Sequence, residues 1–180
     1  MKKTYLLILM LFTIFATKAQ SDESTIQNKK NNEIKLNIVP PLFGAIEAIY
    51  ERNLNKKSSI GGSVFFVYGK ESFEDTNYSI SPYYRRYFGK KYASGFFAEG
   101  FGMFNSTDGK QIKDINGNLT ENEEPDVLDA SLGLGIGSKW VTKSGFIIEI
   151  NAGYGKLLFN ADKTDHTIVA KYGINLGYRF

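Results

Sequence analysis

The feature that most constrains this chain is a two-residue alternation between uncharged and polar side chains, which recurs from Glu33 to Phe180. Successive residues of a β-strand point to opposite faces, so this period predicts strands. Glycine interrupts every candidate helix after Lys57. Turn residues divide the alternation into eight segments, predicted as strands 33–39, 43–52, 59–69, 77–88, 95–105, 127–140, 145–155 and 167–180. The chain is therefore predicted to be all-β.

The connections between these segments alternate in length. The short connections contain lysine and lie near 53–58, 89–94 and 141–144, whereas the longer ones are 70–76, 106–126 and 156–166. The first connection, around Pro40-Pro41, is short and breaks the pattern. Alternation of short turns with long loops is typical of an up-and-down barrel of the bacterial outer membrane.

Each predicted strand divides into an uncharged set and an opposite, polar set. The segment 127–140 shows the uncharged set clearly, as Leu128, Ala130, Leu132, Leu134, Ile136, Ser138 and Trp140. The polar set holds the strand charges, apart from Arg52 and Arg86 near strand ends. With Glu33 set aside at the start of the first strand, it contains five acids and five bases: Glu47, Glu51, Glu99, Asp129, Glu149, Lys35, Arg85, Lys139, Lys171 and Arg179.

Two architectures could use this division. A soluble lipocalin-like barrel would turn the uncharged set inward around an apolar ligand, whereas a membrane barrel would turn it outward to lipid. Eight strands enclose too little space for so many aromatic rings. The rings also gather at the strand ends in two belts, one beside the long loops and one beside the short turns, as at the two interfaces of a bilayer. These interface aromatics are Tyr68, Tyr78, Phe104 and Tyr154, then Tyr50, Phe96, Trp140, Tyr178 and Phe180.

We therefore predict an eight-stranded antiparallel up-and-down transmembrane β-barrel. Because an unpaired buried ion costs several kcal/mol, the ten lumen charges are expected to pair across the interior and to plug it. A selective pore would more naturally carry a ring of one sign. Glycines of the polar set would make room for the long charged side chains: Gly61, Gly133, Gly135, Gly137, Gly173 and Gly177.

A membrane barrel must satisfy its own backbone, because lipid offers no hydrogen bonds. The sheet is therefore expected to close and to leave no edge. Pro82 conflicts with this requirement, since proline removes one hydrogen bond between strands. We expect a β-bulge at Ser81-Pro82 to accommodate it.

The first 19 residues have the three parts of a cleavable export signal. Lys2 and Lys3 precede an apolar stretch of 12 residues, 5–16, and Thr17-Lys18-Ala19 offers small residues before a cut. A helix needs about 20 residues to span a bilayer, so this stretch is too short to be an anchor. We expect cleavage after Ala19, a flexible periplasmic lead-in over 20–32, and a barrel over 33–180.

Composition excludes several functions. Three of the 22 basic residues lie in the first 19 positions, so the remainder has 19 bases and 19 acids and no basic excess for nucleic acid. The absence of cysteine and the single histidine, His166, exclude thiolate and multi-histidine metal sites. We expect no cofactor.

The longest predicted loop, 106–126, is the most acidic part of the chain. Asn116-Gly117 favours a tight hairpin turn, so the loop is expected to extend two strands above the barrel. A calcium site is the alternative, but the glycine that follows Asp114 stands two positions too early for an EF-hand. A solvated loop is the expected outcome.

An outer-leaflet lipid-modifying enzyme is the catalytic alternative, and it would need a histidine and a serine nucleophile near the membrane surface. His166 lies near Asp162 and Asp165, but Thr167 and Ile168 follow it, so the H-x-S spacing of lipid A deacylases is missing. Ser138 belongs to the opposite end of the barrel. We expect the protein not to be an enzyme. A narrow pore and binding through the outer loops stay open as alternatives, with no ligand readable from the sequence.

The last strand, 174–180, ends in phenylalanine and is similar to the C-terminal signal by which outer-membrane barrels are recognised for insertion. The chain resembles in fold the small barrels of the OmpA and OmpX kind. Segments 37–44, 81–89 and 95–102 resemble a Bacteroidetes exported family of unknown function. This resemblance, over about 33–180, implies a monomeric outer-membrane barrel whose partners are membrane lipid and the barrel-insertion machinery. It implies no activity.

Overall fold

The computed structural model describes residues 30–69, 76–107, 111–113, 119–123, 126–160 and 167–180. Several predictions lie outside these residues: the signal peptide, nearly all of the lead-in, the Asn116-Gly117 turn, Asp114, Asp162, Asp165 and His166. Asn31–Phe180 form one compact unit. In the described part of the chain, no helix combines the length and the hydropathy needed to cross a membrane.

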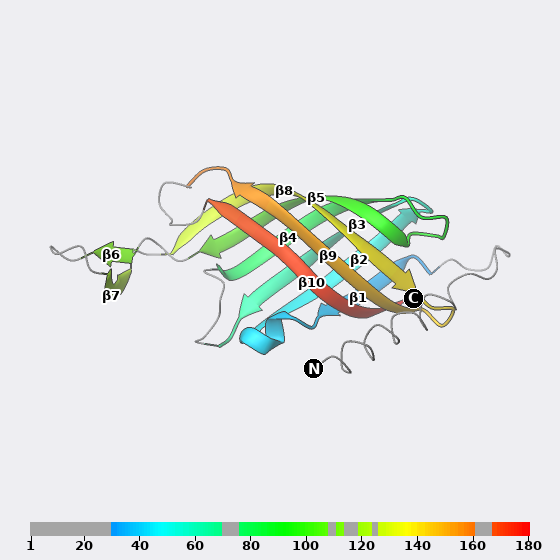
Figure 1. The fold of residues 1–180 in the computed structure, drawn as a ribbon, viewed down its shortest axis with the longest axis horizontal. Coiled ribbons are helices and arrows are strands. Elements are labelled where there is room, and N and C mark those ends of the chain that lie inside the picture. Colours follow the sequence, from blue (N-terminus) through cyan, green and yellow to red (C-terminus); the bar gives the residue numbers. More distant parts are fainter. Residues whose placement is uncertain (1–29, 70–75, 108–110, 114–118, 124–125, 161–166) are drawn as a thin grey trace, which may run out of the picture. The chain divides into compact units, whose positions relative to one another are not determined.

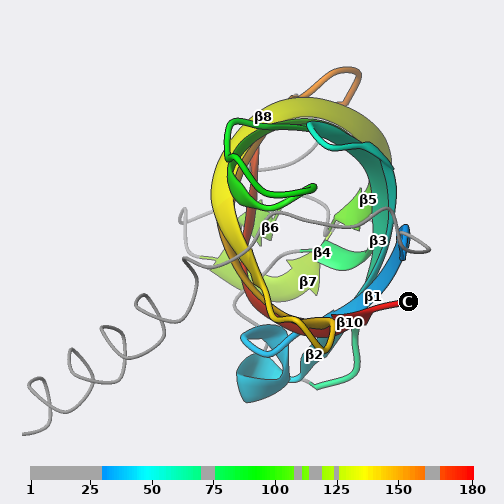
Figure 2. The ribbon, with the colours of Figure 1, turned by 90° about the vertical axis from the view of Figure 1, so that its right-hand side faces the viewer.

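Eight strands form a closed antiparallel barrel in the order β1-β10-β9-β8-β5-β4-β3-β2 (Figures 1 and 2). Strands adjacent in the chain are adjacent in the sheet, and β10 returns to β1, so the predicted up-and-down topology is confirmed. The strands are β1 (Asn32–Asn37), β2 (Ala45–Asn55), β3 (Ser58–Val67), β4 (Thr76–Tyr87), β5 (Gly95–Thr107), β8 (Val127–Val141), β9 (Phe146–Leu157) and β10 (Ile168–Arg179).

Two short strands within the segment predicted as the longest loop pair with each other. They are β6 (Gln111–Lys113) and β7 (Leu119–Glu123), and they form a separate two-stranded antiparallel sheet. The predicted loop 106–126 therefore does contain two strands.

The uncharged set of the strands faces outward and the charged residues mostly face inward, as the prediction of a membrane barrel required. On β8, Leu132 and Leu134 point outward and are 62% and 71% exposed. Glu51 of β2 and Lys139 of β8 point inward and are completely buried. The soluble lipocalin-like alternative required the opposite orientation, so the structure contradicts it.

The connection between β1 and β2 is a 3₁₀ helix, η1 (Pro40–Phe43), which moves the start of the second strand from the predicted residue 43 to Ala45. Proline is favoured at the first helical position because it has no N–H to leave unpaired. Gly44 ends η1 with a φ of 78°, and its carbonyl accepts hydrogen bonds from the amides of Tyr68 and Gly69. A Cβ at Gly44 would lie 2.8 Å from the Cα of Gly69, so this close approach requires glycine.

The predicted bulge at Ser81-Pro82 is wrong. Ile80 pairs with Phe104 and Tyr83 pairs with Phe101, so the register is the same on both sides of Pro82. This register places Pro82 opposite Gly102, and the Ser81 hydroxyl donates to the Gly102 carbonyl at 2.9 Å. The hydroxyl supplies a hydrogen bond where proline has no N–H, and the strand needs no extra residue.

The sheet closes between β1 and β10, as expected, but the pairing covers only part of β10. β1 pairs with β10 from Glu33–Arg179 to Asn37–Asn175, and the Ile38 amide then donates to the Ile174 carbonyl. Beyond this point β10 continues past the end of β1 (Figure 1). The same register would place Pro40 opposite Tyr172, and proline cannot donate to it. The Asn37 side-chain amide donates to the Tyr172 carbonyl instead, at 3.0 Å.

Candidate functional site: the charged interior of the barrel

Large interior side chains lie opposite glycines of the neighbouring strand. Tyr83 pairs with Gly61, Phe101 with Gly133 and Phe97 with Gly137. A Cβ added to these three glycines would come within 2.5, 2.2 and 2.4 Å, respectively, of the facing ring. Each ring therefore occupies the space that a side chain at the facing position would need, consistent with the prediction that these glycines make room in the lumen.

Interior aromatic rings lie next to three of the buried cations. The Arg85 guanidinium carbon lies 4.3 Å from the ring centroids of both Tyr83 and Phe97. Lys139 Nζ lies 4.7 Å from the Tyr87 centroid and Lys171 Nζ lies 4.4 Å from that of Tyr83. Cation–π attraction is strongest where water is excluded, so ring and cation stabilise each other here.

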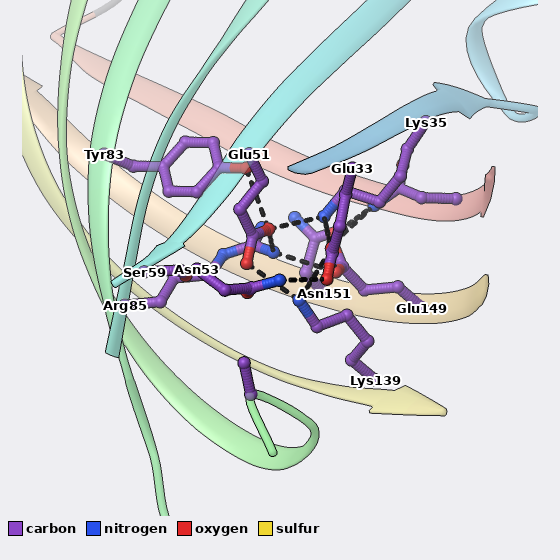
Figure 3. Close-up of polar contacts among 12 residues, drawn as sticks. Glu33, Lys35, Glu51, Asn53, Ser59, Tyr83, Arg85, Lys139, Glu149 and Asn151 are labelled. Atoms are coloured by element: carbon purple, nitrogen blue, oxygen red, sulfur yellow. Dashed lines mark hydrogen bonds and ion pairs between the residues drawn. The ribbon is translucent and has the colours of Figure 1, made fainter. Parts of the chain in front are cut away.

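Glu51 is the centre of the interior network (Figure 3). Its Oε2 accepts hydrogen bonds from Lys35 Nζ at 2.7 Å and Arg85 Nη1 at 2.8 Å. Its Oε1 accepts from Lys139 Nζ at 2.7 Å. The hydroxyls of Tyr83 and Tyr87 add donors at 3.0 and 2.6 Å. One carboxylate thus joins four strands.

Two further carboxylates extend the network around the barrel. Glu149 Oε2 accepts from Lys35 and from Arg85, at 2.7 and 2.8 Å. Glu99 accepts from Arg85 Nε at 2.5 Å and from Lys171 Nζ at 2.6 Å. Arg85 therefore joins three acids, on β2, β5 and β9.

Glu33 belongs to this network, although the sequence analysis set it aside. Its side chain is completely buried, lying 2.8 Å from Lys139 Nζ and 2.6 Å from Arg179 Nη2. β1 begins at Asn32, so Glu33 is already inside the sheet. The signal was present in the sequence, because Glu33 has the same parity as Lys35.

Two of the predicted lumen charges stand apart from the network. Among the described residues, neither Glu47 nor Asp129 lies within 4.0 Å of a cationic nitrogen. Glu47 accepts from the Asn37 amide at 2.8 Å. Asp129 accepts backbone N–H groups of Phe159 and Asn160, at 3.1 and 2.8 Å, and so fixes the end of β9. The structure joins by ion pairs the other eight predicted charges: Lys35, Glu51, Arg85, Glu99, Lys139, Glu149, Lys171 and Arg179.

The turn between β4 and β5 folds across the short-turn end of the barrel (Figure 2). Ala93 is completely buried and packs with Tyr87 and Phe97. Arg179 donates to the carbonyls of Tyr92 and Ala93, at 3.0 and 2.7 Å. From the sequence, 89–94 is predicted only as a short turn, and the apolar pair Tyr92-Ala93 is the one sign that it turns inward.

A second apolar cluster crosses the interior further toward the long loops. Ile49, Tyr83, Phe101 and Met103 are buried in it, and Val169 packs against them. The interior is thus filled by side chains from the Ala93 turn, through the ion-pair network, to this cluster.

The predicted interface aromatics all point outward. Tyr154 is 73% exposed, and the lowest exposure in the set is 43%, for Trp140. Among the barrel-strand residues whose burial the structure describes, one more charge besides Arg52 and Arg86 is exposed, Lys156 at the long-loop end of β9. Lys156 was not predicted as an exposed strand charge, because the predicted strand ends at residue 155.

The sequence profile of a family described as "Protein of unknown function (DUF3575)" matches residues 5–179. The chain belongs to this family. No curated protein matches it. Among solved structures, it is similar to the outer membrane protein Ail of Yersinia pestis, whose backbone structure was solved in a phospholipid bilayer nanodisc. The identity is 16% and the TM-score 0.39, over 83% of this chain and 99% of that one.

The DUF3575 description states no activity and no bacterial group, so the Bacteroidetes resemblance stays a prediction. Within the described residues, the structure shows no group of three or more His, Asp or Glu that could hold a metal ion. Asp114, the acid weighed for calcium, lies outside that part of the chain. Of the catalytic candidates, only Ser138 is described, and it lies at the short-turn end of β8, half-buried.

Proposed function

We propose that this DUF3575 protein is a monomeric, non-enzymatic outer-membrane barrel with a sealed interior, which acts in envelope structure or surface interaction through its outer loops. The observation that carries the proposal is the apolar outward face. Along β8 alone, Leu128, Leu132, Leu134 and Ile136 are all more than half exposed. Soluble monomers rarely expose a continuous apolar surface of this extent, whereas lipid requires one.

The position of the outward charges supports the same placement. Arg52 and Arg86 lie near the short-turn end of their strands, and Lys156 lies near the long-loop end of β9. Charges are costly in hydrocarbon and are tolerated near the interfaces. The band between these two levels, which the aromatic belts also delimit, is the part that would contact acyl chains.

The orientation follows from the two ends of the chain. Asn32 and Phe180 exchange backbone hydrogen bonds at 3.1 and 2.8 Å, so β1 begins where β10 ends, at the short-turn end. Short turns of such barrels face the periplasm. Both termini would therefore be periplasmic, and the C-terminal strand would be presented to the insertion machinery.

The sealed interior favours a structural role over a pore. A conducting path would have to separate ion pairs at 2.7–2.8 Å around Glu51 and move the buried Ala93 turn. We expect negligible single-channel conductance in planar bilayers. Steady conductance would contradict the sealed lumen while leaving the barrel in the membrane.

Fractionation of cells tests the placement directly. The protein is expected in the outer-membrane fraction, and an unboiled sample should migrate differently from a boiled one, because a closed barrel resists detergent until heated. Recovery of the mature chain in the soluble fraction without detergent would overturn the proposal.

A further inference from the structure

We infer that the edge of β10 at Ile168 and Ala170, together with Lys156, binds the headgroup of a phosphorylated glycolipid in the outer leaflet. The inference rests on the proposed placement in the outer membrane and adds a ligand to it. The carrying observation is a stretch of sheet edge in a barrel that is otherwise paired.

The edge presents backbone groups that no described residue satisfies. The backbone groups of even-numbered residues in this part of the chain point from β10 toward β1. The Ile174 carbonyl accepts from the Ile38 amide, and Phe180 exchanges two hydrogen bonds with Asn32. Antiparallel strands alternate in this way, so the N–H and C=O groups of Ala170 and Ile168 also point toward β1. β1 ends at Asn37, and β10 pairs only with β9 from Ile168 to Gly173. In the described part of the chain, nothing pairs with these groups of Ala170 and Ile168.

The edge lies at the level of the lipid headgroups. Ala170 pairs with Tyr154, a member of the long-loop aromatic belt, and Ile168 pairs with Lys156. Aromatic belts mark the membrane interface. Backbone groups unpaired in hydrocarbon would cost several kcal/mol each, whereas at the interface polar headgroups can satisfy them.

The chemistry of the edge selects the class of headgroup. Ala170 and Ile168 each present a donor and an acceptor, and sugar hydroxyls can both accept and donate. A phosphate only accepts. Lys156 is exposed on the same face and has no partner among the described residues, so an anionic group complements it. Hydroxyls and phosphate occur together on a phosphorylated glycolipid.

A second copy of the chain is a poorer occupant. Two copies could join edge to edge at β10 through a two-fold axis, so that one sheet continues across both. In such a sheet the two β10 strands must run antiparallel. Two barrels with the same orientation in a membrane cannot present β10 antiparallel, because both strands run from the long-loop end to the short-turn end.

The test uses the mature chain in phosphatidylcholine nanodiscs that contain lipid A, a phosphorylated disaccharide lipid, as the probe. Native mass spectrometry measures how much lipid A the protein retains. Lys156→Gln should lower the apparent affinity about tenfold by removing a charge-assisted contact. Ala170→Pro removes only an edge N–H and should lower it about fivefold. Lys143→Gln, an exposed lysine in the short turn after β8, is the matched control and should leave it unchanged.

Three outcomes would overturn the inference: equal retention by the parent protein and both variants, equal retention of dephosphorylated lipid A, or full competition by phosphatidylglycerol. Heat-dependent migration of each variant on a gel shows whether it is folded and inserted. A folded, inserted protein that ignores lipid A ends this inference alone, whereas a protein that fails to enter nanodiscs contradicts the proposed function.

Discussion

The inward and outward faces of the same strands tolerate very different changes. Inside, a Cβ at Gly133 would meet the Phe101 ring at 2.2 Å, whereas outside, a Cβ at Gly100 would find no heavy atom within 4 Å. Inside, Glu51 lies against three cations. Outside, the charges stand near strand ends. The substitutions that the interior tolerates are therefore limited by side-chain volume and by charge pairing, whereas those that the exterior tolerates are limited by charge alone.

The largest effect is expected from breaking the interior pairing at its centre. Glu51→Gln would leave Lys35, Arg85 and Lys139 without their shared carboxylate, and we expect the free energy of unfolding to fall by about 3–5 kcal/mol. Urea titration in detergent micelles measures it. Glu47→Gln is the control, because among the described residues the Glu47 side chain accepts a hydrogen bond only from the Asn37 amide, and this substitution should cost about 1 kcal/mol. Equal losses of unfolding free energy in Glu51→Gln and Glu47→Gln would show that Glu51 is not the centre of the network.

A charge on the outward face gives the next effect. Ile150 lies on β9 midway between Phe146 and Tyr154, so Ile150→Arg would place a cation near the centre of the hydrocarbon. We expect a loss of about 2–4 kcal/mol in the free energy of unfolding in lipid vesicles. At the next, inward position, Asn151→Asp should cost less, since Asn175 Nδ2 already donates to the Asn151 side chain at 2.9 Å. Similar losses would contradict the assignment of the two faces.

Added side-chain volume is also expected to distinguish the two faces, but here the larger loss of stability is expected on the inward face. Gly133→Ala inside should cost about 1–3 kcal/mol of unfolding free energy, because the Phe101 ring must move. Gly100→Ala outside should cost nothing, or stabilise slightly by reducing the freedom of the unfolded chain. Thermal denaturation of the two variants in one detergent makes the comparison, and an equal loss would remove the distinction.

The smallest expected effect concerns Pro82. Ser81→Ala removes the hydroxyl that donates to the Gly102 carbonyl, and we expect a loss of about 1 kcal/mol. Ser63→Ala is the control, since Ser63 is also buried but its hydroxyl makes no hydrogen bond with the described residues. If both variants unfold at the same urea concentration, the Ser81 hydroxyl does not compensate for proline.

The exceptions to the sequence predictions share one physical cause. Pro82 and Glu33 were misjudged because each was weighed within its own strand, whereas the groups that satisfy them come from elsewhere. The Ser81 hydroxyl, beside Pro82, donates to the Gly102 carbonyl on the neighbouring strand β5. Arg179, which binds Glu33, is 146 positions away in the chain.

Local periodicity determined which side chains face inward and which face outward, because alternation needs no knowledge of the partner strand. It also determined the number of barrel strands and the up-and-down order. Tertiary structure alone decided which carboxylate meets which cation, how the Ala93 turn closes one end, and where the seam between β1 and β10 stops. These depend on register and on the shape of a closed ring, and both are set only when distant segments meet.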